Sequence, residues 1–176
     1  MMNLCKVVNV MEKVDMFHAK SYYETSLRDL EDKADSFFNI DTVVDKLIDT
    51  YNKYGTIIIA YDYDDTVCPS KPNYNCDNVV KLLKICSEFK EFEMVCYTAR
   101  STYESIDEVR FNLDRLGIRY DTINQDTPRI KEEIEHTYTS KVMYSIFLDD
   151  KAGLGEAFRS LIKFLEWYVK TQLFLI

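Results

Sequence analysis

The feature that most constrains the fold is the apolar run Ile57–Ala60, which is followed closely by three carboxylates. After Tyr61 come Asp62, Asp64 and Asp65. The run has no polar alternation, so it predicts a strand buried on both faces, as in a parallel sheet. Carboxylates at the carboxyl end of such a strand lie where open α/β sheets bind ligands. Acids this close repel one another, so we expect a hard divalent cation such as Mg²⁺ to compensate them, with a solvated acidic turn as the alternative.

Two later segments follow the same pattern of an apolar run that ends in polar side chains. Residues 92–97 precede Thr98, and residues 145–148 precede the paired acids Asp149 and Asp150. Because the carboxyl ends of parallel strands meet at one edge of a sheet, the three runs predict a shared site there.

These segments resemble the motifs of the haloacid dehalogenase (HAD) superfamily of phosphatases and phosphotransferases. The first HAD motif is an apolar strand followed by Asp-x-Asp-x-Thr, which matches residues 62–66. The second motif is a strand ending in Thr or Ser, matched by Thr98, and the fourth is a strand ending in paired acids, matched by Asp149 and Asp150. The resemblance covers roughly residues 56–170.

Two positions match the HAD pattern less closely. The third motif is a lysine before the paired acids, and both Lys141 and Lys131 are candidates, with Lys141 preferred. The residue after the second motif-one acid is often Gly in the family and is Asp65 here. Asp tolerates left-handed backbone better than most residues, so we expect the turn to be kept.

The resemblance implies a catalytic role for each matched residue. Asp62 would be the nucleophile that forms an aspartyl-phosphate, and Asp64 would first protonate the leaving group and then activate water. Thr98 would donate a hydrogen bond to the phosphoryl group, and Lys141 would neutralise charge on the nucleophile and the phosphate. Thr66 is expected to stabilise the turn.

The resemblance also implies a metal and a phosphate site. The cofactor would be Mg²⁺, and its ligands would be Asp62, Asp64 through its backbone carbonyl, Asp149 and Asp150. The substrate-binding residues would be Thr98, Ala99, Arg100 and Lys141. Arg100 either binds substrate phosphate or caps a local carbonyl.

Strand and helix patterns alternate along the chain, which predicts an α/β fold: a HAD-like Rossmannoid three-layer α/β/α sandwich with a central parallel sheet. A helical extension over residues 1–55 would precede a catalytic domain over residues 56–176. The gaps between motifs hold no conventional cap domain, so the site is expected to be of the capless, open type. Besides the three strands above, a strand is expected at 118–123 and helices at 15–38, 41–55, 77–89, 101–116, from 127 and at 154–174. Expected N-caps are Asp41, Asp77 and Ser101 with Glu104, and expected stops are Gly55 and Gly117.

Composition narrows the setting and the partners. The net charge of −8 disfavours non-specific nucleic-acid binding. The five cysteines are odd in number and lack a C-x-x-C pair, which argues against a zinc site or a disulfide framework. Cys86 and Cys96 are expected to be buried. No signal peptide or membrane-spanning run is apparent, so a reducing, cytoplasmic setting is expected.

The sequence therefore favours a Mg²⁺-dependent phosphomonoesterase. Candidate substrates are a nucleotide, a nucleic-acid terminal phosphate or a small phosphorylated metabolite, and transfer to an acceptor other than water stays open. No membrane partner is expected, and the N-terminal helices could support an oligomer. The alternative is a non-catalytic HAD-fold interaction protein that retains the metal site. A phospho-acceptor receiver domain fits less well, because its acceptor Asp lies on a middle strand, and here that strand ends in Thr98.

Overall fold

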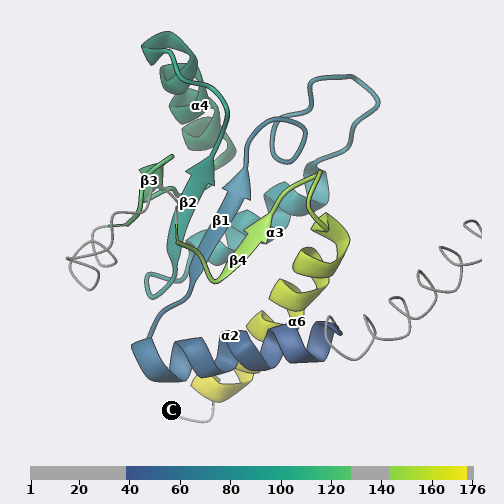
Figure 1. Cartoon of the computed structure of the whole chain (residues 1–176), viewed down its shortest axis with the longest axis vertical. Coiled ribbons are helices and arrows are strands. Elements are labelled where there is room, and N and C mark those ends of the chain that lie inside the picture. The colour runs from purple at the N-terminus through teal and green to yellow at the C-terminus, as the bar shows by residue number, and fades with distance from the viewer. Residues whose placement is uncertain (1–38, 128–142, 174–176) are drawn as a thin grey trace, which may run out of the picture. The chain divides into compact units, whose positions relative to one another are not determined.

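The computed structural model describes residues 39–127 and 143–173 (Figure 1). Contacts divide the chain into two compact units, Met1–Thr42 and Val43–Ile176, and nearly all described residues belong to the second. The predicted division at residue 55 into extension and catalytic domain stays a prediction. In chain order the elements are α2 (Ile40–Tyr54), β1 (Ile58–Asp62), α3 (Asp77–Ser87), β2 (Glu93–Tyr97), α4 (Tyr103–Leu116), β3 (Thr122–Ile123), β4 (Ile146–Leu148) and α6 (Leu154–Leu173).

Within the described residues, the strands form one sheet of four in the order β3-β2-β1-β4, and every pairing is parallel. β1 lies between β2 and β4, with Asp62 opposite Tyr97 and Tyr61 opposite Leu148. The segments that follow these three strands therefore leave the sheet at the same edge. This confirms the predicted α/β class with a parallel central sheet.

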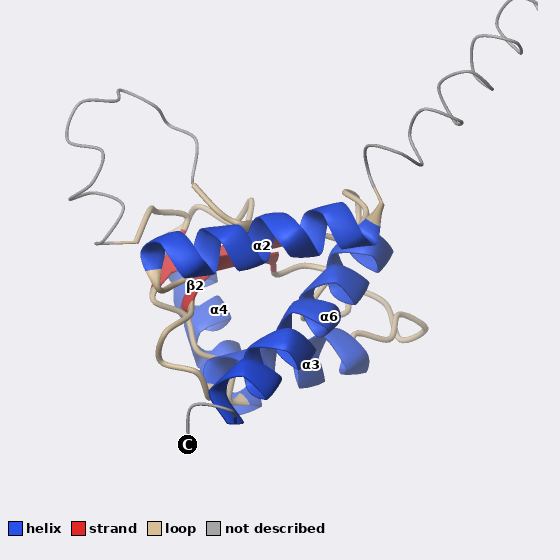
Figure 2. Ribbon diagram, turned by 90° about the horizontal axis from the view of Figure 1, so that it is seen from below, coloured by secondary structure: helices blue, strands red, loops and turns tan. Residues whose placement is uncertain are grey.

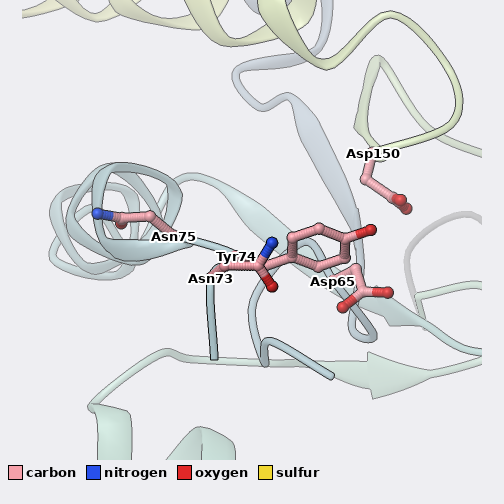
Figure 3. Close-up of a pocket in the computed structure, with 5 residues that line it drawn as sticks. All are labelled: Asp65, Asn73, Tyr74, Asn75 and Asp150. Atoms are coloured by element: carbon pink, nitrogen blue, oxygen red, sulfur yellow. The ribbon is translucent and has the colours of Figure 1, made fainter. Parts of the chain in front are cut away.

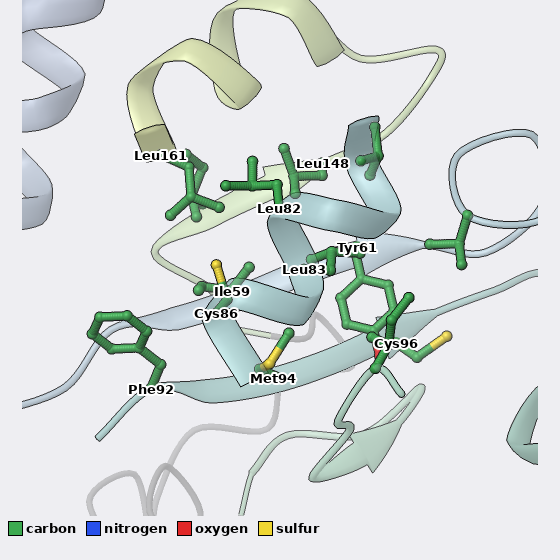
Figure 4. Packing of buried hydrophobic residues seen from close by; sticks show 14 of the residues in the cluster. Ile59, Tyr61, Leu82, Leu83, Cys86, Phe92, Met94, Cys96, Leu148 and Leu161 are labelled. Atoms are coloured by element: carbon green, nitrogen blue, oxygen red, sulfur yellow. The ribbon is translucent and has the colours of Figure 1, made fainter. Parts of the chain in front are cut away.

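The side chains of the strands alternate between two apolar clusters. Ile59 and Tyr61 of β1 face the larger cluster, whereas Ile58 and Ala60 face a smaller one with Val95. Each of the four described helices contributes buried side chains to the larger cluster, part of which is drawn in Figure 4. Burial on both faces explains why β1 is an unbroken apolar run. The helix expected at 15–38 lies outside the described residues, and so does the helix expected from 127, except for Thr127 itself. The third layer of the expected α/β/α sandwich stays a prediction.

The view along the sheet from below shows α2 crossing beneath the strands beside α6 (Figure 2). An aromatic cluster joins the two helices: the Tyr51 ring lies 5.1 Å from that of Tyr168 and 6.1 Å from that of Trp167, centroid to centroid. Leu47 of α2 is also buried in the larger cluster. From Val43 onward, α2 is therefore part of the core beneath the sheet.

Two helices begin differently from the prediction. Asn39, not Asp41, caps α2, because its Oδ1 accepts the N–H groups of Asp41 and Thr42. At α3 the N-cap position is Cys76, with no side-chain capping bond, and Asp77 is the first helical residue. Asn and Asp side chains are about equally good caps, so the sequence alone does not choose between Asn39 and Asp41 at α2.

The start of α4 is also shifted, whereas its end is as predicted. Its capping box pairs Thr102 with Ser105 rather than Ser101 with Glu104. Gly117 ends the helix in left-handed backbone, with φ +70°. Gly55 likewise follows α2 with φ +69°.

The strand expected at 118–123 is reduced to Thr122–Ile123. The residues before it make other hydrogen bonds: the N–H of Ile118 donates to Leu113 at the helix end, and that of Arg119 donates to the Ser87 hydroxyl. The first bond closes the helix end, and both take Ile118 and Arg119 out of the sheet, so the strand begins later in the segment.

Over the described residues, no helix is long and apolar enough to cross a membrane. The cysteines there, Cys68, Cys76, Cys86 and Cys96, are free thiols. Cys86 and Cys96 are buried, as predicted, and burial raises the pKa of each thiol to about 12. Both therefore act as small apolar core residues.

Candidate metal and phosphate site

Three predicted metal ligands come together at the carboxyl edge of the sheet. Asp62 ends β1, and Asp149 and Asp150 follow β4, which pairs directly with β1. Each offers a carboxylate oxygen, and these oxygens lie within 4.8 Å of one another. We call these three residues the acid cluster.

The electrostatics of the acid cluster favour a bound cation. The pKa of Asp62 is raised to about 6, first because the carboxyl is partly buried and then because Asp149, Asp150 and Asp64 are nearby. The backbone N–H of Tyr63 opposes this rise. Hard carboxylate oxygens in this number suit Mg²⁺ or Ca²⁺, and nothing in the cluster distinguishes the two.

Thr66 joins the two loops that carry the acid cluster. Its side chain is fully buried. Its hydroxyl accepts the N–H of Asp150 at 3.0 Å and donates to Asp62 Oδ2 at 3.5 Å. Thr66 thus positions two of the cluster residues, in line with the stabilising role expected of it.

Asp64 lies two residues after Asp62, yet its carboxylate is held by a cation of the chain. Arg100 donates to it twice, from Nη2 to Oδ1 at 2.8 Å and from Nε to Oδ2 at 3.2 Å. Arg100 also donates to Glu108 at 2.8 Å, and its guanidinium lies 5.0 Å from the centroid of the Tyr63 ring. The hydrogen bonds from Arg100 to Asp64 are the main reason that the pKa of the arginine is raised.

In this structure the arginine is an ion-pair partner of Asp64 and Glu108. Its expected role in binding substrate phosphate stays a prediction. Glu108 lies on α4, one of the segments that sequence reasoning did not connect to the site. The Asp64 carboxylate is not among the three that meet in the acid cluster, and Arg100 holds it instead.

Thr98 is held in place by Asn124, which sequence reasoning missed. The N–H of Thr98 donates to Asn124 Oδ1, and Asn124 Nδ2 donates to the Thr98 carbonyl, both at 2.8 Å. The hydroxyl of Thr98 accepts the N–H of Arg100 at 3.2 Å. Asn124 follows β3 with φ +54°. An Asn directly after a short apolar segment is the signal that could have found it, since Asn tolerates left-handed backbone.

The remaining predicted residues are placed only in part. Ala99 lies between Thr98 and Arg100 and is exposed. Lys131 and Lys141 lie outside the described residues, so the choice between them stays a prediction.

A pocket adjoins the acid cluster. It has a volume of about 320 Å³ and is lined by Asp65, Asn73, Tyr74, Asn75 and Asp150 (Figure 3). Asp65 has φ +63°, which confirms the left-handed turn expected there. Its Oδ1 accepts the N–H of Ser70 at 2.7 Å. Hydrogen bonds from Ser70 lower the pKa of Asp65, and Lys151 and Lys71 add to this effect.

Comparisons with known proteins identify no family for the chain. No family model matches it, and no curated protein matches it. Among solved structures, a conserved protein from Bacteroides thetaiotaomicron is similar, with a TM-score of 0.44 and 21% identity over 55% of this chain and 77% of that one. A likeness at this TM-score carries no argument about function.

Proposed function

We propose that this chain is a HAD-like, Mg²⁺-dependent phosphomonoesterase that works through an aspartyl-phosphate on Asp62. The observation that carries the proposal is the meeting of Asp62, Asp149 and Asp150 at the edge where Thr98 also follows its strand. A carboxyl group whose pKa is raised by burial and by neighbouring acids, as that of Asp62 is, is typical of functional sites.

The acid cluster would hold the ion through the carboxylates of Asp62, Asp149 and Asp150, with the backbone carbonyl of Asp64 as a further ligand. Bound there, Mg²⁺ would neutralise charge on the phosphoryl oxygens. The lengths of the gaps between the motifs predict no conventional cap, so the site would accept either a small phosphoester or a terminal phosphate.

The reaction would proceed in two steps at the phosphorus atom. Asp62 attacks phosphorus in line as the bond to the leaving oxygen breaks, and Asp64 gives its proton to that oxygen. Asp64 then takes a proton from water as the water oxygen attacks the aspartyl-phosphate, which releases inorganic phosphate and restores Asp62. The Thr98 hydroxyl would donate a hydrogen bond to a phosphoryl oxygen, and the site lysine, Lys141 by preference, would balance the negative charge.

The ion pair between Arg100 and Asp64 matters to this scheme. Asp64 must carry a proton to act as an acid, so the pair must loosen when substrate binds. A phosphoryl oxygen can replace a carboxylate oxygen at the guanidinium, because arginine recognises both groups with the same planar geometry. Arg100 would then pass from holding Asp64 to holding the substrate.

The same ion pair is the observation that favours the second candidate, a non-catalytic interaction protein that retains the metal site. A carboxylate held permanently by arginine would have no proton to give. A chain of this kind would bind Mg²⁺ and release no phosphate.

A phosphatase assay separates the two. We expect the full-length protein to hydrolyse p-nitrophenyl phosphate with Mg²⁺ and to stop when EDTA is added. Asp62→Asn should lower kcat by about a thousandfold or more, since it removes the nucleophile. The matched control is Asp107→Asn, which alters a surface acid paired with Arg110 on α4. Equal activity of the two variants would contradict the proposal.

A further inference from the structure

The pocket beside the acid cluster lies where the rest of a substrate would extend. It shares Asp150 with the cluster, and its other lining residues all belong to the segment between β1 and α3 (Figure 3). A phosphoester held at the cluster would therefore direct its leaving group along this segment. The volume of about 320 Å³ is at the lower end of the range for small-molecule pockets, which suits a single ring.

The lining combines hydrogen-bonding groups with one aromatic face. The carboxylates of Asp65 and Asp150 accept hydrogen bonds, and the carboxamide of Asn73 both accepts and donates them. The Tyr74 side chain projects toward the two carboxylates in Figure 3, and 43% of the residue is exposed. An aromatic ring among such groups offers an apolar surface on which the C–H groups of a ligand can pack, while the hydroxyl groups of that ligand reach the polar side chains of the pocket.

Charged groups of both signs lie at the pocket. Lys151 Nζ lies 4.0 Å from Asp150 Oδ1, and Lys71 Nζ lies 5.5 Å from the centroid of the Tyr74 ring. Both lysines act electrostatically on Asp65. Because carboxylates and ammonium groups are both present, the charge of the pocket selects neither an anionic nor a cationic ligand.

We propose that this pocket binds the leaving group of the substrate and that this group is a neutral, hydroxyl-rich ring, namely a sugar or a cyclic polyol. The inference rests on the proposed phosphomonoesterase activity and names the substrate class for that site. The ring would lie against Tyr74, with its hydroxyls bonded to Asn73 and Asp65.

A substrate comparison on the full-length protein with Mg²⁺ tests the inference. We expect kcat/KM for hexose monophosphates to exceed that for nucleoside monophosphates and for phosphoethanolamine by about tenfold, the worth of one or two well-made hydrogen bonds. A preference for either of the other substrates would overturn it. If p-nitrophenyl phosphate and every other ester are left intact, the proposed phosphatase activity is wrong. The pocket is then tested only by the binding of hexose phosphate.

Variants and binding measurements complete the test. Tyr74→Ala should lower kcat/KM for the preferred hexose phosphate by about tenfold, mostly through KM, and by less for p-nitrophenyl phosphate. The control Tyr103→Ala changes a residue of α4 that is 89% exposed and should affect neither substrate. Calorimetry with the Asp62→Asn protein should show hexose phosphate binding that weakens when Tyr74→Ala is added. Equal losses on both substrates, or binding that ignores Tyr74, would overturn the inference.

Discussion

The acid cluster and the Asp64–Arg100–Glu108 group are two neighbouring sets of carboxylates, and they are compensated in different ways. Arg100 lies between Asp64 and Glu108 and contacts both at 2.8 Å. Within the described residues, the cluster of Asp62, Asp149 and Asp150 has only the exposed Lys151 beside it, at 4.0 Å from Asp150. In one group a cation of the chain lies between the two carboxylates and leaves one net negative charge, whereas the other group suits a cation from solution. A single intervening residue, Tyr63, is enough to separate the two.

The lysine of the third motif tests whether the chain also contributes a cation to the acid cluster. We expect Lys141→Ala to lower kcat by about a hundredfold or more, since a cation beside a carboxylate and a phosphate is worth a few kcal/mol. Lys131→Ala is the matched control and should cost far less. Activity of both variants is measured at saturating Mg²⁺. If Lys131→Ala is the damaging change, the assignment of the two lysines is reversed.

Metal affinity tests the acid-cluster side of the comparison. We expect Asp149→Asn to weaken Mg²⁺ binding by about tenfold or more, because a charged ligand is replaced by a neutral one. Asp64→Asn keeps the backbone carbonyl and should leave the affinity nearly unchanged. Titration calorimetry on both variants gives the answer, and equal weakening would mean that the Asp64 carboxylate takes part in binding.

The ion pair tests the other side. We expect Arg100→Ala to lower kcat/KM by about tenfold while Mg²⁺ affinity stays the same, since the arginine's bidentate contact to the substrate phosphate would be lost. Arg100→Lys should recover only part of the loss, because an ammonium group cannot make the paired contact. The surface variant Arg110→Ala serves as control. A loss of metal affinity in Arg100→Ala would mean that the ion pair and the acid cluster form a single site.

The smallest expected effect concerns stability and pH. The pKa of Asp62 is raised from 3.8 to about 6 in the folded protein, so folding favours its protonated form. The resulting stabilisation is fully present below about pH 4 and is lost as the pH rises through about 6. We expect metal-free protein to show this loss in chemical unfolding, and Asp62→Asn to remove it. A slope that survives in Asp62→Asn would assign it to another group.

The sequence was sufficient to predict a parallel central sheet and the meeting of Asp62, Asp149 and Asp150 at its edge. An unbroken apolar run such as Ile57–Ala60 is typical of a strand buried on both faces in a parallel sheet. Parallel strands bring their carboxyl ends to one edge of that sheet. Left-handed backbone at Asp65 also followed from residue type.

The supporting residues could not be predicted in the same way. Glu108 and Asn124 reach the site through tertiary packing, and neither belongs to a spaced motif. The pocket residues Asn73 and Tyr74 come from a segment without periodicity. Helix starts shifted by one or two residues because neighbouring polar side chains compete as caps, as Asn39 and Asp41 do.

The buried hydroxyl of Thr66 has a consequence for the entropy of metal binding. By contacting Asp62 and the backbone of Asp150 together, it links the segment after β1 to the segment after β4. Ligands that are already spaced before the ion arrives lose little conformational freedom on binding. Thr66→Val puts a methyl group in place of the hydroxyl and leaves all three carboxylates present. Metal binding would then have to order the carboxylates, and this loss of conformational entropy would lower the affinity.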